Sequence, residues 1–322
     1  MPTTFLHGVE VLQIDTGVRP IQTVRSSVIG LIGTAPDADA TAFPLNTPVL
    51  IASKSDYATV GATGTLKGAL DQIYAQAGAV VVVVRVTAGA SDEATITNVV
   101  GGINATTGAY EGVYDFLSAE NAVGFSPRIL IAPGFTHQRH DNGILTIPVT
   151  TQGAGYTTAP AVTISAPASG GVQATAIAVL GTGANAGKVV SITVTNPGTN
   201  YTSAPTVTIA APTSGTQAVA GTATRGTVRN RVLAELLGIA QRLRAVVIAD
   251  GPNTTDAAAI QVKNDFGSDR IYVVDPWVLV GGVSTPASSA VAGLINKVDN
   301  ERGFWWSPSN NQIAGKIGRA HV

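Results

Sequence analysis

The residues best suited to chemistry are two histidines three positions apart, His137 and His140, followed directly by Asp141. Imidazole and carboxylate groups bind zinc and serve in general acid–base catalysis. A zinc site needs about four ligands, however, and no further ligand with a zinc spacing stands near this group. We therefore interpret the cluster as a solvated loop and predict neither a bound metal nor a cofactor.

Two aspartates, Asp250 and Asp275, stand at the ends of apolar runs that we predict to be strands. Enzymes of the α/β class place active residues at the carboxyl ends of strands, so an enzyme that uses this pair is one hypothesis. Each aspartate precedes Gly-Pro or Pro, where aspartate commonly forms turns. We therefore predict turn-forming roles and no enzymatic activity.

A glycine-rich segment, residues 181–187, imitates a phosphate-binding loop. It lacks the Lys-Ser/Thr ending and stands between two predicted strands rather than between a strand and a helix. We interpret it as a turn.

Composition excludes several classes of function. Only 12 % of the 322 residues are charged and the net charge is -1, so no basic field attracts nucleic acid. The chain has no cysteine, which excludes a disulfide scaffold and a cysteine nucleophile. The longest apolar run, 79–84, is far shorter than the roughly 20 residues of a membrane helix, and the start of the chain lacks a secretory pattern. We expect no membrane insertion, synthesis in the cytoplasm, and self-assembly favoured by the low charge.

The clearest organisational signal is a repeat with an offset of 45 residues. The segment 144–167 reappears at 189–212, so that Tyr156 corresponds to Tyr201. Each copy shows a strand pattern, a glycine-rich turn, Tyr-x-x-Ala-Pro and a second strand pattern. We interpret residues 142–224 as an inserted all-β domain that carries a two-copy internal repeat.

The predicted insertion is almost free of charge, since its only charged residue is Lys188. Without acids, histidines or cysteines it cannot perform acid–base or metal chemistry. We expect Tyr156 and Tyr201 to be surface contacts, because their rings would offer stacking faces to a host surface, a glycan or a neighbouring copy. An exposed β domain without a partner is the alternative.

Outside the insertion, helical and strand patterns alternate. Helical spacing of apolar residues predicts helices over 66–77 and 228–243. Thr285 and Pro286 predict the N-cap and first residue of a helix that runs to about Arg302. Continuous apolar runs predict buried strands over 80–86, 128–132, 244–250 and 270–274. The pattern predicts a mixed α/β core in two parts, 36–141 and 225–322, which the insertion interrupts at a surface loop.

The first 35 residues contain a strand pattern for which no neighbouring hairpin partner exists. A strand of this kind can pair with a sheet edge on another chain, although an edge strand of its own domain is the more common case. We predict that it is an inter-subunit strand made of Gly8, Val9, Glu10, Val11, Leu12, Gln13 and Ile14.

Several sequence blocks, taken in order, resemble the sheath subunits of contractile bacteriophage tails, as found in P2-like phages and R-type bacteriocins. The strongest block runs from Pro286 to Ile295 and on through Asp-Asn-Glu-Arg-Gly-Phe-Trp-Trp-Ser-Pro-Ser-Asn at 299–310. The other blocks are 8–11, 15–21, 27–36, 110–117 and 127–134. The resemblance covers about 1–140 and 226–318, and it implies an α/β sheath core.

The resemblance implies a structural subunit that forms hexameric rings around a tail tube and contracts to drive the tube through the host envelope. It implies the tail tube, baseplate and tail terminator proteins as partners, and a place in the virion after assembly in the host cytoplasm. In this family terminal arms add strands to neighbouring subunits, and residues 1–35 would form the N-terminal arm and first strands. The insertion would lie on the outer surface.

This chain differs from the family in its length. Family members continue past the Ser-Asn segment, whereas this chain stops at Val322, so either it is a fragment or its numbering covers only part of the product. We expect the chain alone to stay monomeric. The sequence does not separate a phage tail from a bacteriocin or another contractile injection device. The alternative function is an adhesin or glycan-binding surface protein that acts through the inserted β domain.

Overall fold

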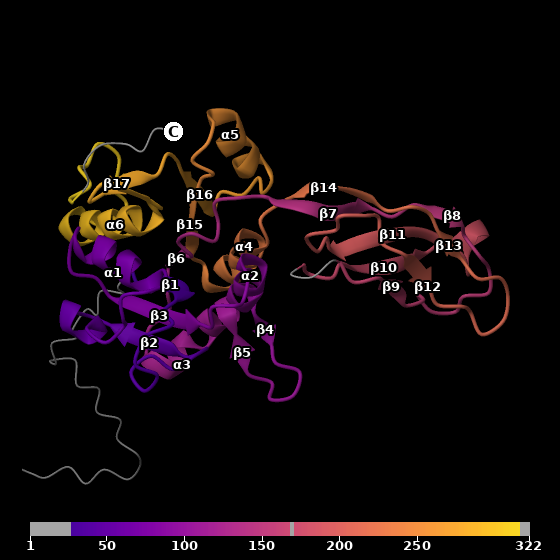
Figure 1. Cartoon of the computed structure of the whole chain (residues 1–322), viewed down its shortest axis with the longest axis horizontal. Coiled ribbons are helices and arrows are strands. Elements are labelled where there is room, and N and C mark those ends of the chain that lie inside the picture. The colour runs from indigo at the N-terminus through magenta and orange to yellow at the C-terminus, as the bar shows by residue number, and fades with distance from the viewer. Residues whose placement is uncertain (1–26, 168–170, 316–322) are drawn as a thin grey trace, which may run out of the picture.

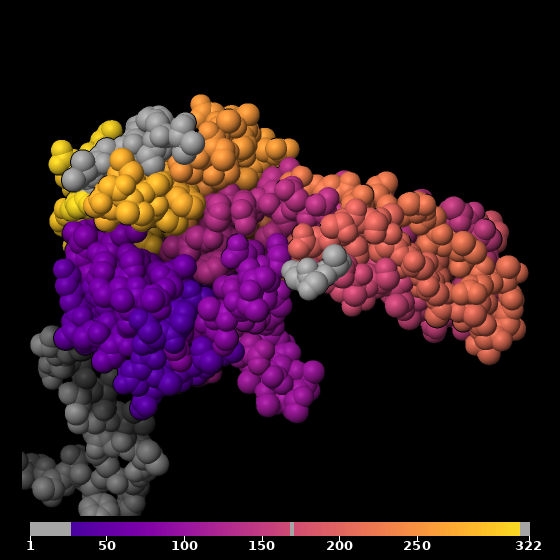
Figure 2. Space-filling view, viewed as in Figure 1, coloured from indigo at the N-terminus to yellow at the C-terminus, as the bar shows by residue number. Residues whose placement is uncertain are grey.

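This computed structural model describes residues 27–167 and 171–315. The predicted inter-subunit strand, Gly8–Ile14, lies outside the described residues. The described chain forms an α/β body and a second region rich in strands, residues 140–228, which we call the β unit. Figure 2 shows the β unit projecting from one side of the body.

The body is built on a six-stranded sheet with the order β16-β15-β6-β1-β3-β2. Its strands are β1 (Ile29–Thr34), β2 (Pro48–Ile51), β3 (Val81–Val86), β6 (Ile129–Ile131), β15 (Val246–Asp250) and β16 (Ile271–Val274). Neighbouring strands run parallel except β2, which pairs antiparallel with β3. The central strands are almost fully buried, as expected for a sheet covered on both faces.

Helices cover the two faces of this sheet and create two apolar cores. On one face, α1 (Leu66–Tyr74) and α6 (Ser288–Arg302) pack with the strand residues Leu31 and Val83. On the other, α2 (Asp92–Val100), α4 (Arg231–Leu243) and the 3-10 helix η2 (Gly112–Leu117) pack with Ile32 and Val84. The alternation of side chains along β1 and β3 thus divides the apolar residues between the cores.

Smaller elements complete the body. They are the 3-10 helix η1 (Lys54–Tyr57), the helices α3 (Ala119–Val123) and α5 (Asp256–Asn264), and two hairpins, β4 (Gly102–Ile103) with β5 (Tyr110–Glu111) and β17 (Val278–Val280) with β18 (Val283–Thr285). In the part of the chain that the structure describes, no helix has both the length and the apolar character needed to cross a membrane.

The predicted helices and buried strands of the body are confirmed, with shifts at their ends. The start of the last helix is the clearest correction. Thr285 and Pro286 were expected to begin it, but α6 starts at Ser288 with Ala287 as its N-cap. The reason lies far away in sequence, because Asp250 at the end of β15 accepts the backbone hydrogen bond of Ser288.

The β unit contains eight strands around its own apolar core. They are β7 (His140–Thr146), β8 (Val149–Thr151), β9 (Val162–Ile164), β10 (Thr175–Leu180), β11 (Val189–Asn196), β12 (Val207–Ile209), β13 (Val219–Ala220) and β14 (Thr224–Val228), with the 3-10 helix η3 (Gly183–Asn185) after β10. The antiparallel pair β7 and β14 runs between the body and the other strands (Figure 1).

Strand pairing within the β unit follows the 45-residue offset. In the antiparallel pair β9–β12, Thr163 lies opposite Thr208, its counterpart by this offset. The other two pairs are related by this offset to within one residue. Thr175 of β10 lies opposite Asn196 of β11 and Val219 of β13 lies opposite Thr151 of β8, so that β8 and β11 are related by 45 positions but β10 and β13 by 44. The third strand of each copy therefore pairs with the first strand of the other copy.

Candidate functional site

The prediction of a solvated loop is wrong for His140, which is buried on a strand, whereas His137 lies in the loop before β7 and is half-buried. His140 is 2 % exposed on β7, and its Nδ1 lies 3.4 Å from Glu93 Oε1. The ring of His137 stands edge-on to that of Trp277, with the ring centres 5.2 Å apart, and burial lowers the pKa of His137. Residues 27–167 and 171–315 contain no group of three histidine, aspartate or glutamate side chains arranged to hold a metal.

Asp250 is completely buried and serves the fold. Its Oδ1 accepts a hydrogen bond from the Ser288 backbone N–H and its Oδ2 accepts one from the Ser288 hydroxyl, each at 2.8 Å. The negative charge faces the positive end of the α6 dipole. Burial nevertheless raises the pKa of Asp250 to about 6. A carboxylate enclosed in this way is not presented to a substrate.

Asp275 serves the fold through a contact with a loop 22 positions earlier in the chain. Its Oδ1 accepts a hydrogen bond from the backbone N–H of Asn253 at 2.9 Å. The glycine-rich segment 181–187 is a turn, because it contains η3 and connects the antiparallel strands β10 and β11. Gly183 and Gly187 have positive φ there, which glycine adopts at little cost.

Tyr156 and Tyr201 are not surface residues, so the prediction of exposed stacking faces is wrong. Their side chains are 6 % and 2 % exposed and belong to the core of the β unit. Each hydroxyl is used twice, once as a donor to a backbone carbonyl and once as an acceptor from a backbone N–H. The adhesin hypothesis therefore loses the two aromatic rings on which it depended.

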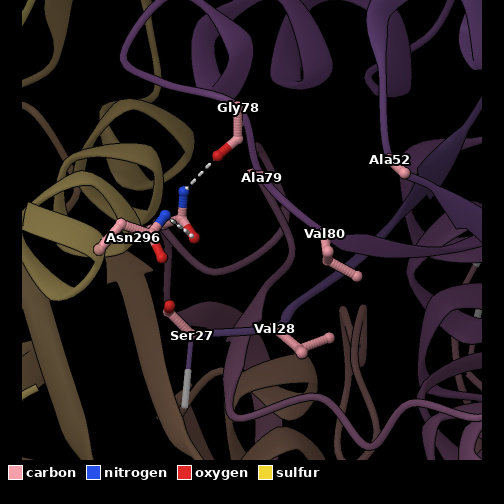
Figure 3. A pocket seen from close by; sticks show the side chains of 8 residues that line it. Ser27, Val28, Ala52, Gly78, Ala79, Val80 and Asn296 are labelled. Carbon is pink, nitrogen blue, oxygen red and sulfur yellow. Dashed lines mark hydrogen bonds between the residues drawn. The ribbon is translucent and has the colours of Figure 1, made fainter. Parts of the chain in front are cut away.

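The main pocket of the body lies at the amino-terminal ends of β1 and β3 (Figure 3). It has a volume of about 450 Å³ and is lined by backbone and small side chains, with Ser27, Asn296 and Asn300 as its polar groups. Asn296 donates to the carbonyl of Gly78 at 2.9 Å. Its lining residues include no acid, base or nucleophilic cysteine, so the pocket offers no general acid or base.

A polar cluster joins the body to the β unit, and the sequence analysis did not identify it. Glu93, in the first turn of α2, accepts a hydrogen bond from the Thr199 hydroxyl at 3.0 Å and faces His140. The contact with His140 is the main cause that lowers the pKa of Glu93, and Thr199 and Arg231 lower it further. Burial acts in the opposite direction and raises this pKa. These residues are far apart in sequence, and no motif or spacing connects them.

The segment that carries the strongest sequence block is also the most exposed aromatic surface of the body. Phe304, Trp305 and Trp306 follow α6 and are 69 %, 72 % and 53 % exposed. Arg302 stacks on the Trp306 ring at 5.8 Å from its centre. Exposed apolar groups of this kind commonly mark contact surfaces.

The described residues thus define a protein with a three-layered α/β body, in which helices cover both faces of one sheet, a projecting β unit, and polar groups that connect elements of the fold. Comparison with known proteins identifies its class. Residues 208–320 match the family model of the phage tail sheath protein central domain. Residues 26–86 match the model of the tail sheath protein Gp18 domain III N-terminal region.

Relatives with assigned names agree with these matches. The chain is 31 % identical to a putative prophage major tail sheath protein of Pseudomonas aeruginosa strain UCBPP-PA14, over 98 % of this chain and 60 % of that protein. It is 32 % identical to the tail sheath protein of Burkholderia phage BcepMu, over 99 % of this chain and 66 % of that protein. The chain belongs to the tail sheath protein family of contractile bacteriophage tails, which confirms the resemblance.

A further relative is more similar over a shorter region. The tail sheath protein of Escherichia phage P2 is 42 % identical over 135 residues, which are 40 % of this chain and 34 % of that protein. The chain spans 60 % of the length of the Pseudomonas relative and 66 % of that of the BcepMu relative.

Proposed function

We propose that the chain is a structural subunit of a contractile tail sheath, which polymerises around a tail tube and contracts to drive the tube through the host envelope. The observation that carries this proposal is the 31 % identity to a prophage tail sheath protein over 98 % of the chain. The two aspartates of the enzyme hypothesis support it indirectly, because Asp250 is buried and the Asp275 carboxylate accepts a hydrogen bond from the Asn253 backbone.

The architecture of the body suits this role. Two apolar cores on opposite faces of one sheet make the body rigid. A rigid body can exchange one set of surface contacts for another without changing its own fold, and the free-energy difference between the two packings would be the stored energy of contraction. The exposed aromatic segment 304–306 is a candidate for such a contact surface.

The proposal includes partners and a location. The subunits would form hexameric rings in a helical sheath, contacting the tail tube, baseplate and tail terminator proteins, and would be part of the virion after assembly in the host cytoplasm. Gly8–Ile14 would pair with a neighbouring subunit as an N-terminal arm. The alternating pattern of this segment supports that assignment. The proposal requires no cofactor, nucleic acid or membrane insertion.

We further propose a domain organisation: an N-terminal arm and first strands (1–35), two core segments (36–141 and 225–322), and an inserted all-β domain (142–224) built from two copies of one unit. The separate apolar core of the β unit supports the insertion. The corresponding pairs β10–β11 and β13–β8, whose registers agree with the offset to within one residue, support the repeat. The insertion would lie on the outer surface of the sheath.

Negative-stain electron microscopy of the reading frame that contains these residues tests the proposal. Hollow, striated tubes of uniform width are the expected result, and antibodies against the loop around Ala184 should label them along their whole length. Uniform monomers at high concentration, or labelling confined to one end of a tail, would contradict the sheath assignment and favour the adhesin.

A further inference from the structure

The β unit is held to the body mainly by polar contacts. None of the apolar clusters in the described part of the chain combines core residues of the body with those of the β unit. The hydrogen bond from Thr199 to Glu93 connects the two parts at 3.0 Å. Cavities lie on either side of it, one of about 110 Å³ lined by Pro197 and Arg231 and one of about 410 Å³ lined by Glu93 and Val172. Little apolar burial therefore fixes the orientation of the β unit.

The antiparallel pair β7–β14, which we call the ribbon, joins the body to the other strands of the β unit, and one of its residue pairs contributes no side chains. Gly143 of β7 lies directly opposite Gly226 of β14, so neither strand contributes a side chain there. The register is irregular between Thr224 and Arg225 and again between Gly226 and Val228. Bulges and glycines lower the cost of bending a two-stranded ribbon, because they interrupt the ladder and widen the accessible backbone conformations.

Glu93 contacts both the loop that contains Thr199 and the first residue of the ribbon, His140. One of its oxygens accepts a hydrogen bond from the Thr199 hydroxyl, and the other lies 3.4 Å from His140 Nδ1. Thr199 is 1 % exposed and is fixed in turn by Val172, whose N–H donates to its hydroxyl oxygen at 3.2 Å. The Glu93 carboxylate on α2 thus contacts the Thr199 loop of the β unit and His140, the first residue of the ribbon, at the same time.

We propose that the ribbon is a hinge at Gly143 and Gly226 and that Glu93 is the latch that holds the β unit in one orientation against the body. Loss of the Glu93 contact leaves the backbone hydrogen bonds from Asn200 to Asp141 and from Tyr201 to Asn142 as the ties between this loop and the body side of the ribbon. When these also open, the β unit swings about the ribbon while its own core and the two cores of the body stay intact. The device is a property of the single chain and does not depend on sheath assembly, so its failure and that of the sheath assignment are separable.

The test is a distance measurement between the two parts in solution. Because the chain has no cysteine, Gln261→Cys on α5 and Ala184→Cys in η3 place two nitroxide labels at exposed positions without background. Double electron–electron resonance then gives the distribution of distances between the body and the β unit. The parent protein should show one narrow distribution.

Glu93→Ala removes the latch, and Asp92→Ala is its matched control. Asp92 is the neighbouring exposed acid of the same first turn, so both variants lose a similar interaction with the helix dipole. We expect a broader distribution for Glu93→Ala and the parent distribution for Asp92→Ala. Equal distributions for Glu93→Ala, Asp92→Ala and the parent, with the variants folded by circular dichroism, would overturn the latch.

Gly226→Ala locates the hinge. A Cβ at this position would meet the Cδ1 atom of Leu145, which is the end of a half-exposed side chain and can move aside. In the Glu93→Ala background, Gly226→Ala should narrow the distribution again because it stiffens the ribbon. Persistence of the full broadening in the double variant would overturn the hinge assignment.

Discussion

Tyr156 and Tyr201 occupy equivalent positions across the two halves of the β unit, each with its hydroxyl anchored in the other half. The Tyr156 hydroxyl donates to the Ala210 carbonyl at 3.0 Å and accepts from the Ala218 N–H at 2.9 Å. The Tyr201 hydroxyl donates to the Ser165 carbonyl at 3.1 Å and accepts from the Ala174 N–H at 2.8 Å.

This reciprocity has a structural consequence. Each sequence copy supplies a tyrosine that completes the hydrogen bonds of the other copy, in addition to exchanging strand pairs with it. Two glutamines are also equivalent, but each bonds within its own copy: Gln173 donates to the Ile164 carbonyl and Gln217 donates to the Ile209 carbonyl. Neither half is complete alone, so the halves should fold and unfold together.

The first prediction concerns these hydroxyls. Tyr156→Phe and Tyr201→Phe each leave a buried N–H and a buried carbonyl without their partner, so each should lower the free energy of unfolding by about 1–3 kcal/mol. Urea denaturation followed by near-ultraviolet circular dichroism measures the loss. Tyr272→Phe is the control, because that side chain is 60 % exposed on β16. A loss for one tyrosine alone would contradict the equivalence of the two halves.

The second prediction concerns the contact between β15 and α6. Asp250→Ala removes the acceptor of both Ser288 hydrogen bonds, leaving a buried N–H and a buried hydroxyl unpaired, and should destabilise the protein by about 2–4 kcal/mol. Asp250→Asn keeps one acceptor oxygen and should cost less. Asp269→Ala, at an exposed position, is the control. Chemical denaturation measures the free energy of unfolding of each variant. An Asp250→Ala variant as stable as the parent would contradict the capping role of Asp250.

The third prediction is a pH dependence that arises from Asp115. This side chain is 3 % exposed, and burial, assisted by the charge of Glu111, raises its pKa to about 7. Because the folded-state pKa lies above the ordinary value of 3.8, the folded state holds a proton that the unfolded state releases. Stability from this group is therefore present below about pH 4 and is lost as the pH rises towards 7.

Asp115→Asn removes this titration. Relative to the parent, the variant should gain about 1–3 kcal/mol of stability between about pH 4 and pH 8. Urea denaturation at several pH values measures the difference, with the exposed Asp92→Asn as the control. A stability difference between variant and parent that does not change with pH would show that Asp115 does not titrate in this range.

The fourth prediction compares two helical glycines. A Cβ at Gly68 of α1 would enter open space, so Gly68→Ala should stabilise the protein by about 0.5–1 kcal/mol. A Cβ at Gly293 of α6 would meet the Ile73 carbonyl oxygen at 2.8 Å, so Gly293→Ala should destabilise it by forcing α6 away from α1. Thermal unfolding of the two variants should therefore show opposite shifts of Tm, and shifts of the same sign would contradict close packing of these helices.

The sequence alone determined several elements of the body, because continuous runs such as 80–86 and helical stripes such as 66–77 reflect local periodicity, but it did not indicate the edge strand β2 or α2, which carries Glu93. The ordered blocks also identified the sheath family. A change of composition over 142–224 also indicated the region in which most strands of the β unit lie.

Only the tertiary structure decided which side chains are buried and what they contact. The sequence predicted exposed rings for Tyr156 and Tyr201, but their buried hydroxyls accept hydrogen bonds from the backbone N–H groups of Ala218 and Ala174, just before β13 and β10. The sequence predicted that His140 lies in a loop, but its side chain is buried beside Glu93, a residue 47 positions earlier in the sequence. Hydrogen bonds between distant segments form only after strand order and register bring them together, and no local period or propensity contains that information.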